Sequence, residues 1–383
     1  MSDCPDRFPT RDLAIKRALP ERFFLTVLVV AAEQRDMKET PTVSLHEYDA
    51  AVASAYRRFF PDDPEKSAEF LEWRFRRNPH GVGKFAIAAW GDRVTGMIAL
   101  SATRLRNVGW EPLAYQAMDT FVDASARGSG LFVKMGSVAQ DPLALGSELL
   151  WGYPNANAAP GWYGRLGWTN FGKVPLLMRP LRSGFILRRV HPRLRALDFK
   201  LVGAGRAVGR DYDDGSQLAA DFDPLWNRIA PSFGITVDRS GAWMRWRLFD
   251  RPGSGYRCVG MKSGDDLEAL VVTKLAHKHG GRLLYVMEAI SSPERSANLV
   301  RLLKSELGHA AEMGAEVALA WCPSTAPNYR AYRRAGFIPV PNRIRPIEIN
   351  FGARALTTAS SAAADPNARW YINRRCPRLS CAA

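Results

Sequence analysis

Residues 73–79 read Trp-Arg-Phe-Arg-Arg-Asn-Pro, and residues 246–252, 173 positions later, read Trp-Arg-Leu-Phe-Asp-Arg-Pro. The same offset aligns residues 91–93 with residues 264–266, and both triplets begin with Gly-Asp. Further along the chain the offset becomes 169. It aligns Met118-Asp119 with Met287-Glu288 and Pro154 with Pro323. It also aligns Tyr163, Arg165, Gly167 and Trp168 with Tyr332, Arg334, Gly336 and Phe337. One loop that differs by four residues, between about residues 101 and 113, accounts for the change of offset. We infer that one structural unit occurs twice.

Each copy shows the same order of patterns. A Trp-containing helical segment precedes two alternating apolar strands around the Gly-Asp turn, which is a hairpin signal. A third strand, a helix, a buried strand and a short helix then follow. In the first copy we expect three strands at 85–89, 94–100 and 115–122, a helix at 128–139 and a buried strand at 149–153. In the second copy we expect three strands at 257–261, 267–273 and 283–290, a helix at 294–313 and a buried strand at 317–322. The prediction is a mixed α/β fold with a mixed sheet, repeated as two tandem domains.

The length of 383 residues and the 46% hydrophobic content fit two globular domains. The repeat sets the expected boundaries between them. We expect an irregular N-terminal extension at residues 1–43 and a first domain at residues 44–182. A linker follows at residues 183–210, then a second domain at residues 211–353 and a flexible C-terminal tail at residues 354–383.

The chain is strongly basic, with a formal net charge of +15. Within residues 179–210 there are nine Arg and Lys residues, whereas Asp198 is the only acid, and apolar residues alternate with them. A basic amphipathic segment binds anionic membranes or nucleic acid. It also serves as a linker packed across two domains, and we favour that interpretation over a membrane or nucleic-acid partner.

Cysteine usage and hydropathy indicate a cytoplasmic protein. The five cysteines include no Cys-x-x-Cys motif and the histidines form no metal-binding motif, so we expect neither a disulfide framework nor a metal site. The ten apolar residues at 23–32 are too few to span a bilayer. A second methionine, Met37, precedes the first patterned sequence, so residues 1–36 are interpreted as an extension or a start-site artefact, with a secretion signal as the alternative.

The chemistry of the first copy is concentrated in residues 119–132, Asp-Thr-Phe-Val-Asp-Ala-Ser-Ala-Arg-Gly-Ser-Gly-Leu-Phe. A strand ends there, and Arg127-Gly128-Ser129-Gly130 opens a helix. Glycines allow close approach to the backbone, and the free N–H groups at a helix start attract anions. The turn therefore predicts an anion site that suits a diphosphate.

This turn and the downstream Tyr163-Gly-Arg-Leu-Gly167-Trp168 resemble the motif pair of the GNAT (GCN5-related N-acetyltransferase) superfamily. The resemblance covers about residues 44–182, and a weaker version covers 211–352. It implies that acetyl-CoA or another acyl-CoA binds along the strand and the turn, at Thr120, Phe121, Val122, Arg127, Gly128, Ser129, Gly130 and Leu131, with Asn155 nearby. One departure is Ser125, which stands where the family usually has Arg or Gln.

The resemblance also implies two catalytic roles. Asp119 would act as the base for the amine, whose ordinary pKa is about 10.4 for a lysine side chain. Tyr163 would protonate the leaving thiolate. The alternatives are a capping or salt-bridging carboxylate for Asp119, a packed aromatic for Tyr163, and a turn-forming residue for Asn155.

The second copy departs from the motif. Residues 296–299, Ser-Ala-Asn-Leu, replace the glycine turn, whereas Glu288 and Tyr332 keep the places of Asp119 and Tyr163. We expect a degenerate domain without a phosphate site that contributes half of an acceptor groove.

The expected function is transfer of an acetyl or related acyl group to a small amine or amino sugar. One alternative is a Fem-like transferase that uses aminoacyl-tRNA, which the basic charge would suit. Another is a non-catalytic CoA-binding protein. Acceptor identity, acyl length and oligomeric state are not encoded in these patterns.

Overall fold

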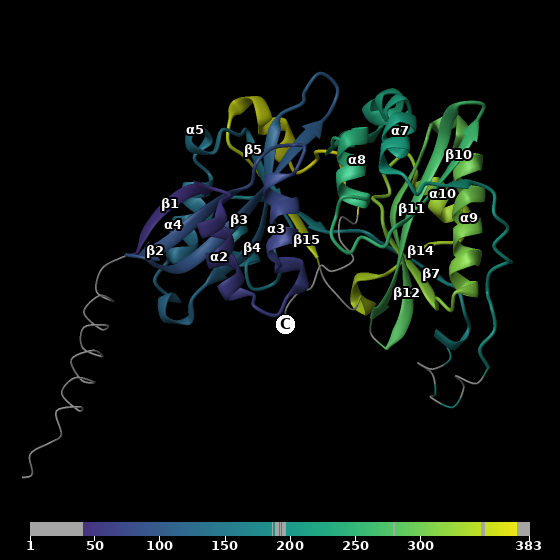
Figure 1. The fold of residues 1–383 in the computed structure, drawn as a ribbon, viewed down its shortest axis with the longest axis horizontal. Helices are drawn as coiled ribbons and strands as arrows, with labels where there is room; N and C mark the ends of the chain where they lie inside the picture. The colour runs from purple at the N-terminus through teal and green to yellow at the C-terminus, as the bar shows by residue number, and fades with distance from the viewer. Residues whose placement is uncertain are drawn as a thin grey trace, which may run out of the picture.

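In the computed structural model the described residues are 41–185, 187, 191, 193, 197–278, 280–345 and 349–373. The expectations for residues 1–40 lie outside this part of the chain. Two sheets stand side by side, each flanked by helices (Figure 1). No helix among the described residues is long and apolar enough to cross a membrane.

The first sheet has the order β1-β2-β3-β4-β5-β15-β6. Its strands are β1 (Thr42–Glu47), β2 (Lys84–Trp90), β3 (Arg93–Arg106), β4 (Leu113–Val122), β5 (Leu149–Gly152), β15 (Asn350–Ala355) and β6 (Thr169–Lys173). The helical segments of the first copy are α2 (Ala50–Phe59), η1 (Pro64–Lys66), α3 (Ala68–Leu71), η2 (Glu72–Arg76), η3 (Ala124–Ala126), α4 (Leu131–Ala139), α5 (Pro142–Leu145) and η4 (Pro160–Arg165). The end of β3 also pairs with β9 (Ile235–Val237), and β9 pairs with β16 (Trp370–Tyr371).

The second sheet has the order β14-β7-β13-β12-β11-β10-β8. Its strands are β14 (Ile338–Pro339), β7 (Leu176–Pro180), β13 (Val317–Trp321), β12 (Gly281–Ser291), β11 (Asp266–Lys278), β10 (Arg257–Ser263) and β8 (Arg210–Asp211). The helical segments that follow the linker are α7 (Gly215–Ile229), η6 (Ala230–Phe233), α8 (Gly241–Leu248), η7 (Pro293–Arg295), α9 (Ser296–Glu312), α10 (Tyr329–Arg334), η8 (Asn342–Ile344) and η9 (Thr358–Ala364).

The two sheets repeat one topology, as the duplicated sequence predicts. The series β2-β3-β4-β5 and the series β10-β11-β12-β13 each contain two antiparallel pairings followed by a parallel one. Six residues connect β3 to β4, whereas two connect β11 to β12. This difference of four is the loop change expected between residues 101 and 113.

The sheets exchange a strand, which the expected domain boundaries did not include. Strand β7 belongs to the first copy in sequence but pairs with β13 and β14 of the second sheet. In return, β15 inserts between β5 and β6 of the first sheet, with Arg354 opposite Leu150. The boundaries 44–182 and 211–353 are therefore wrong as spatial units, because each ends in a strand of the other sheet.

The prediction of a flexible tail from residue 354 is wrong for residues 354–373. Strand β15 continues to Ala355, and η9 and β16 follow it. Trp370 is buried and its indole N–H donates to the Ala363 carbonyl oxygen at 2.9 Å. The apolar residues 370–372 carried this signal, and the Ala/Ser-rich stretch before them obscured it.

The described part of the linker packs on the second domain. The guanidinium of Arg182 pairs with Asp198 at 2.7 Å, and the chain folds back so that Arg182 bridges to Lys200. Gly205 lies so close to α9 that an added Cβ would be 2.3 Å from the backbone nitrogen of His309. These contacts fix the second half of the linker along α9.

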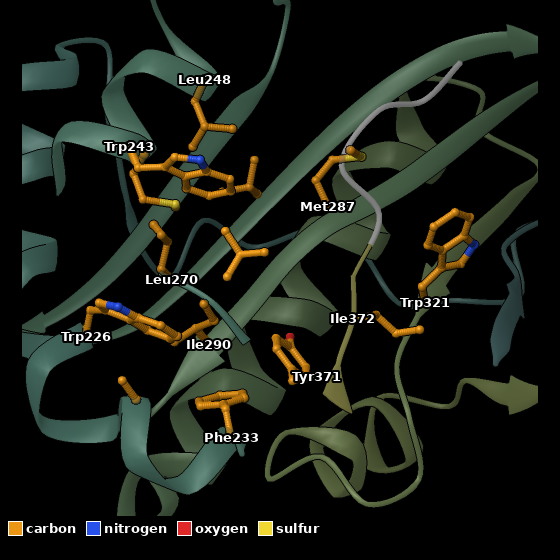
Figure 2. Close-up of a cluster of buried hydrophobic side chains, with 14 of the residues drawn as sticks. Trp226, Phe233, Trp243, Leu248, Leu270, Met287, Ile290, Trp321, Tyr371 and Ile372 are labelled. Carbon is orange, nitrogen blue, oxygen red and sulfur yellow. The ribbon is translucent and has the colours of Figure 1, made fainter. Parts of the chain in front are cut away.

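One hydrophobic core joins the two sheets. It includes side chains of β4 and β5 together with residues of α7, α8, β11 and β12. Figure 2 shows its second-domain part: Trp226, Phe233, Trp243, Leu248, Leu270, Met287, Ile290, Trp321, Tyr371 and Ile372. The two domains therefore share buried apolar surface, so they cannot separate without exposing it to water.

Candidate active site

Strands β4 and β5 of the first sheet diverge at one end. They pair in parallel only from Ala114–Leu149 to Ala117–Gly152, and β4 continues to Val122 without a described partner on that side. Gly152 is needed where they part, because an added Cβ would be 2.8 Å from the Ala117 carbonyl oxygen. The peptide groups of Thr120, Phe121 and Val122 lie on this diverging stretch, where an extended amide chain could pair with them.

A bulge marks the start of the open stretch. The register between β3 and β4 shifts between Met97 and Ala99, and Asp119 lies in the bulge with a φ of 46°. It is the only residue other than glycine with a positive φ among the described residues. Such strained backbone persists only where its surroundings enforce it, and it is concentrated at functional sites.

The predicted glycine turn follows β4 and opens α4. Gly128 and Gly130 have φ values of 82° and 76°, and an added Cβ on either would have no neighbour within 4 Å. No side chain caps the N-terminus of α4. Within the described part of the chain, the backbone N–H groups of Gly128, Gly130 and Leu131 have no acceptor. The turn is an open concavity of donors that fits a diphosphate.

Side chains beside the turn hold its shape. The Ser129 hydroxyl donates to the Ala126 carbonyl oxygen at 2.7 Å, and the Ser125 hydroxyl donates to Asp123 at 2.6 Å. Arg127 is exposed, and its Nε–H donates to the Val122 carbonyl oxygen at 3.4 Å. Its charge is therefore available to an anion bound at the turn.

Tyr163 lies on η4 with a buried hydroxyl. No hydrogen-bond partner of this hydroxyl exists among the described residues, and burial raises its pKa to about 12. The ring contacts Gly352 on the exchanged strand β15, where an added Cβ would be 2.6 Å from Cε1 of Tyr163. The hydroxyl keeps its proton at neutral pH and has an unused donor, as a proton donor requires.

Asn155, the remaining predicted cofactor residue, forms a turn. Its Oδ1 accepts the backbone N–H of Ala158 at 2.9 Å. This is the structural alternative that the sequence offered for Asn155, and its cofactor role stays a prediction. No described hydrogen bond joins Asn155, Tyr163 and Asp119 to one another.

Asp119 is part of a charged cluster. Its carboxylate is 2.5 Å from the ammonium of Lys66 and accepts a hydrogen bond from the Tyr56 hydroxyl. Burial alone would raise the pKa of Asp119, but the charges of Lys66 and Arg74 outweigh it and hold that pKa below its ordinary value. An ionised, paired carboxylate is a weak base, so this arrangement favours the salt-bridging alternative. Its role as the catalytic base stays a prediction.

The second domain contains the matching cluster. The carboxylate of Glu288 pairs with Arg239 at 3.3 Å and with Arg247. At the offsets of the repeat, Arg239 corresponds to Lys66 and Arg247 to Arg74. The Glu288 side chain is 0% exposed, whereas that of Asp119 is 25% exposed. Sequence analysis noted the acids but missed the cations, although Arg74 and Arg247 stand in the opening motifs.

The equivalent cleft of the second domain is filled by the chain itself. Leu299 occupies the place of Gly130 in the repeat, and it is fully buried. The amide of Asn373 donates to the Met287 carbonyl oxygen at 3.2 Å, and the Tyr371 ring lies 4.9 Å from the Arg239 guanidinium. Figure 2 shows Tyr371 and Ile372 in the core beside Met287. The second domain therefore has a buried leucine where the first has Gly130, and residues 371–373 lie against the matching strand.

Helix winding also distinguishes the copies. Segments η2 and η4, which carry Arg74 and Tyr163, are π-helical, whereas α8 and α10 at the matching places are α-helical. Single-turn π-helices occur frequently at functional sites. Both π-helical segments, η2 and η4, therefore belong to the first copy, which also has the open glycine turn.

Comparisons with known proteins give a consistent picture of the fold. No protein-family model matches the chain, and no curated protein matches it in sequence. Among solved structures, a GCN5-related N-acetyltransferase from Anabaena variabilis superposes with a TM-score of 0.58 and 11% identity, covering 84% of this chain and 75% of that one. A GCN5-related N-acetyltransferase from Kribbella flavida gives 0.53 and 15%, covering 84% and 74%.

Saccharomyces cerevisiae N-myristoyltransferase with bound myristoyl-CoA superposes with a TM-score of 0.54 and 10% identity, covering 83% of this chain and 85% of that one. At such low identity the superpositions establish the fold. They extend over most of both chains, so the likeness includes both sheets.

Proposed function

We propose that this chain, whose fold is that of the GCN5-related N-acetyltransferases, is an acyl-CoA-dependent N-acyltransferase with one working site, in its first domain. The observation that carries the proposal is the open glycine turn at the start of α4, placed beside the divergence of β4 and β5. Its unpaired N–H groups suit the diphosphate of CoA. The unpaired edge of β4 suits the amides of the pantetheine arm.

Bound acyl-CoA supplies an activated acyl group, and the residues of this chain position it. The backbone amides of Gly128, Gly130 and Leu131 hold the diphosphate, with Arg127 adding charge. The acyl group that we favour is acetyl, and the acceptor is a small amine or amino sugar.

The proposed reaction is direct transfer. The neutral amine attacks the thioester carbon, the carbon–sulfur bond breaks, and the thiolate takes a proton from the Tyr163 hydroxyl. The amine proton passes to solvent, with Asp119 as the candidate acceptor on that path, since a quarter of its side chain is exposed. Tyr163 then regains a proton from water, so the enzyme returns to its starting state.

A pair of matched variants tests the cofactor site. Gly128→Glu places a carboxylate where the diphosphate would bind. No atom lies within 4 Å of the added Cβ, so the cost to the fold is the backbone strain of a side chain at a φ of 82°. Ala297→Glu adds the same charge at the matching exposed position of α9. Calorimetry with CoA should show binding to the wild type and to Ala297→Glu at one site per chain, and no binding to Gly128→Glu. Unchanged affinity in a folded Gly128→Glu variant would show that the site lies elsewhere.

A further inference from the structure

The guanidinium of Arg74, at the edge of the site, is partly exposed and has few described partners within the protein. Its Nη1 donates to the sulfur of Met118 at 3.4 Å, and its centre lies 4.9 Å from the ring of Phe70. Among the described residues no carboxylate lies within 4.0 Å of it. A thioether is a weak acceptor, so most of the five donors of this side chain are free for a ligand.

The matching arginine of the second domain shows what Arg74 lacks. Arg247 is buried and pairs directly with Glu288. In the first domain, Asp119 pairs instead with Lys66, and the half-buried Arg74 has no ion-pair partner within 4.0 Å among the described residues. The same position in the repeat is thus satisfied by the protein in one copy and left open in the other.

Arg74 lies on the opposite face of the sheet from α4. Helix α4 packs on one face, against Ala86, Ile98 and Leu100. Helix α2 and η2 pack on the other face, against Phe85 and Ala99. A cofactor held at the start of α4 therefore enters from the first face. Arg74 lies beyond the opposite face, beside Met118, where the divergence of β4 and β5 begins.

We propose that Arg74 binds an anionic group of the acyl acceptor, which makes the acceptor an amine that also carries a carboxylate or a phosphate. This inference rests on the proposed function and names its substrate class. A guanidinium binds either anion through two parallel hydrogen bonds. The rings of Phe70 and Trp73 lie 4.9 and 5.7 Å from the centre of the Arg74 guanidinium and pack against it. The anion on Arg74 leaves the amine of a small acceptor within reach of the bulge at Asp119.

The test compares Arg74→Gln with Arg76→Gln, a control on the same segment whose side chain is exposed. Acceptors are offered in matched pairs: an amino acid and its methyl ester, and glucosamine 6-phosphate and glucosamine. Thiol release with acetyl-CoA gives kcat and KM, and calorimetry with CoA present gives acceptor affinity without turnover. Thermal unfolding checks each variant, and Arg74→Lys keeps the charge if Arg74→Gln fails to fold.

We expect the wild type to prefer the anionic member of one pair. Arg74→Gln should raise KM and Kd for that member roughly 10- to 100-fold, the scale of hydrogen bonds to a charged group. Its CoA affinity and its Kd for the neutral member should stay unchanged, as should all properties of Arg76→Gln. Any change in kcat should be the same for both members, because the charge of Arg74 also lowers the pKa of Asp119. Which pair responds distinguishes a carboxylate from a phosphate.

Two results would overturn the assignment. One is an equal loss of affinity, measured as Kd, for charged and neutral acceptors, and the other is a wild type that binds both members of each pair equally. Acceptor binding that depends on Arg74 without any thiol release would support the anion site and contradict the proposed transferase function. Thiol release that is unchanged in Arg74→Gln would support the proposed transferase function and contradict the anion site.

Discussion

The indole N–H of Trp73 donates to the backbone carbonyl oxygen of Trp246 at 2.8 Å, and the indole N–H of Trp246 donates to that of Trp73 at 2.9 Å. The two rings stack with centroids 4.6 Å apart. These residues open the two matching sequence motifs. The contact is therefore self-complementary, like the interface of a twofold dimer, but it is made within one chain.

Replacing either tryptophan with phenylalanine should destabilise the protein. Each single variant leaves one buried carbonyl without its donor, which costs on the order of 1–3 kcal/mol. Trp73→Phe, Trp246→Phe and the double variant are compared by urea unfolding. We expect the double variant to lose at least 0.5 kcal/mol less than the sum of the single losses, the scale of coupling between contacting residues. Strictly additive losses would show that the two hydrogen bonds act independently.

Tyr163→Phe should lower turnover roughly 10²-fold, the scale of a lost proton donor. Its stability should not fall, because the hydroxyl has no partner to lose among the described residues. Since the pKa of Tyr163 is about 12, its deprotonation should cause no fall in kcat between pH 6 and about 10. Tyr332→Phe is the control in the second domain, and its turnover should match the wild type. Equal rate losses in both variants would indicate two working sites.

Gly352 connects the exchanged strand to the site. Gly352→Ala would place a methyl group 2.6 Å from the Tyr163 ring and 3.0 Å from the Thr169 carbonyl oxygen. We expect a loss of about 1–3 kcal/mol in unfolding free energy from overpacking, together with reduced kcat. Combining it with Tyr163→Phe should reduce kcat little further, because both changes act on one hydroxyl. Wild-type kinetics for Gly352→Ala would contradict the placement of Tyr163.

Glu288 should make stability depend on pH. Burial would raise the pKa of Glu288, but Arg239 and Arg247 lower it below the ordinary value of 4.5. In the unfolded chain Glu288 takes up its proton at a higher pH than in the folded chain. Stability from this group is therefore fully present above about pH 5 and is lost as the pH falls through the lowered value.

Glu288→Gln should cost roughly 3–5 kcal/mol at pH 7, because it removes the carboxylate that pairs with two buried arginines. It should also make the free energy of unfolding depend less on pH at acidic pH. Asp119→Asn is the matched control, and its smaller loss follows from its partial exposure. Urea unfolding from pH 3 to 8 measures both. A smaller loss for Glu288→Gln than for Asp119→Asn would refute this ranking of the two clusters.

A fragment of residues 1–210 should not fold alone. It lacks β15, which lies between β5 and β6 of the first sheet, and it carries β7 without its partners. Circular dichroism and CoA calorimetry should show an unfolded fragment without affinity. Co-expression with residues 211–383 should restore both signals. A folded, CoA-binding fragment would show that the exchanged strand is dispensable.

The sequence predicted the positions of the strands and helices better than it predicted which strands pair in each sheet. Local periodicity located β2, β3, β4 and α9 within a few residues, except that β3 and β11 continue past their predicted ends. Strand exchange was not predictable, because the pattern of β15 shows that its residues are buried without showing against which sheet. The glycine turn was found because it has a backbone geometry that only glycine supplies readily.

Side-chain clusters were less accessible to sequence analysis. Lys66 and Arg74 lie 53 and 45 residues before Asp119, and only the fold brings the three together. The repeat did contain a signal, since Arg74 and Arg247 occupy matching positions in both motifs. Comparing the copies for shared charges as well as shared shape would have identified the pair.

The exchange of β7 and β15 has a consequence for the history of the gene. Deleting either half would remove a strand from the sheet that remains, so we expect the loss of one copy to unfold the other. Under the proposed function, the second half could do without a phosphate-binding turn but could not be deleted. A descendant with a single half would first have to return each strand to its own sheet.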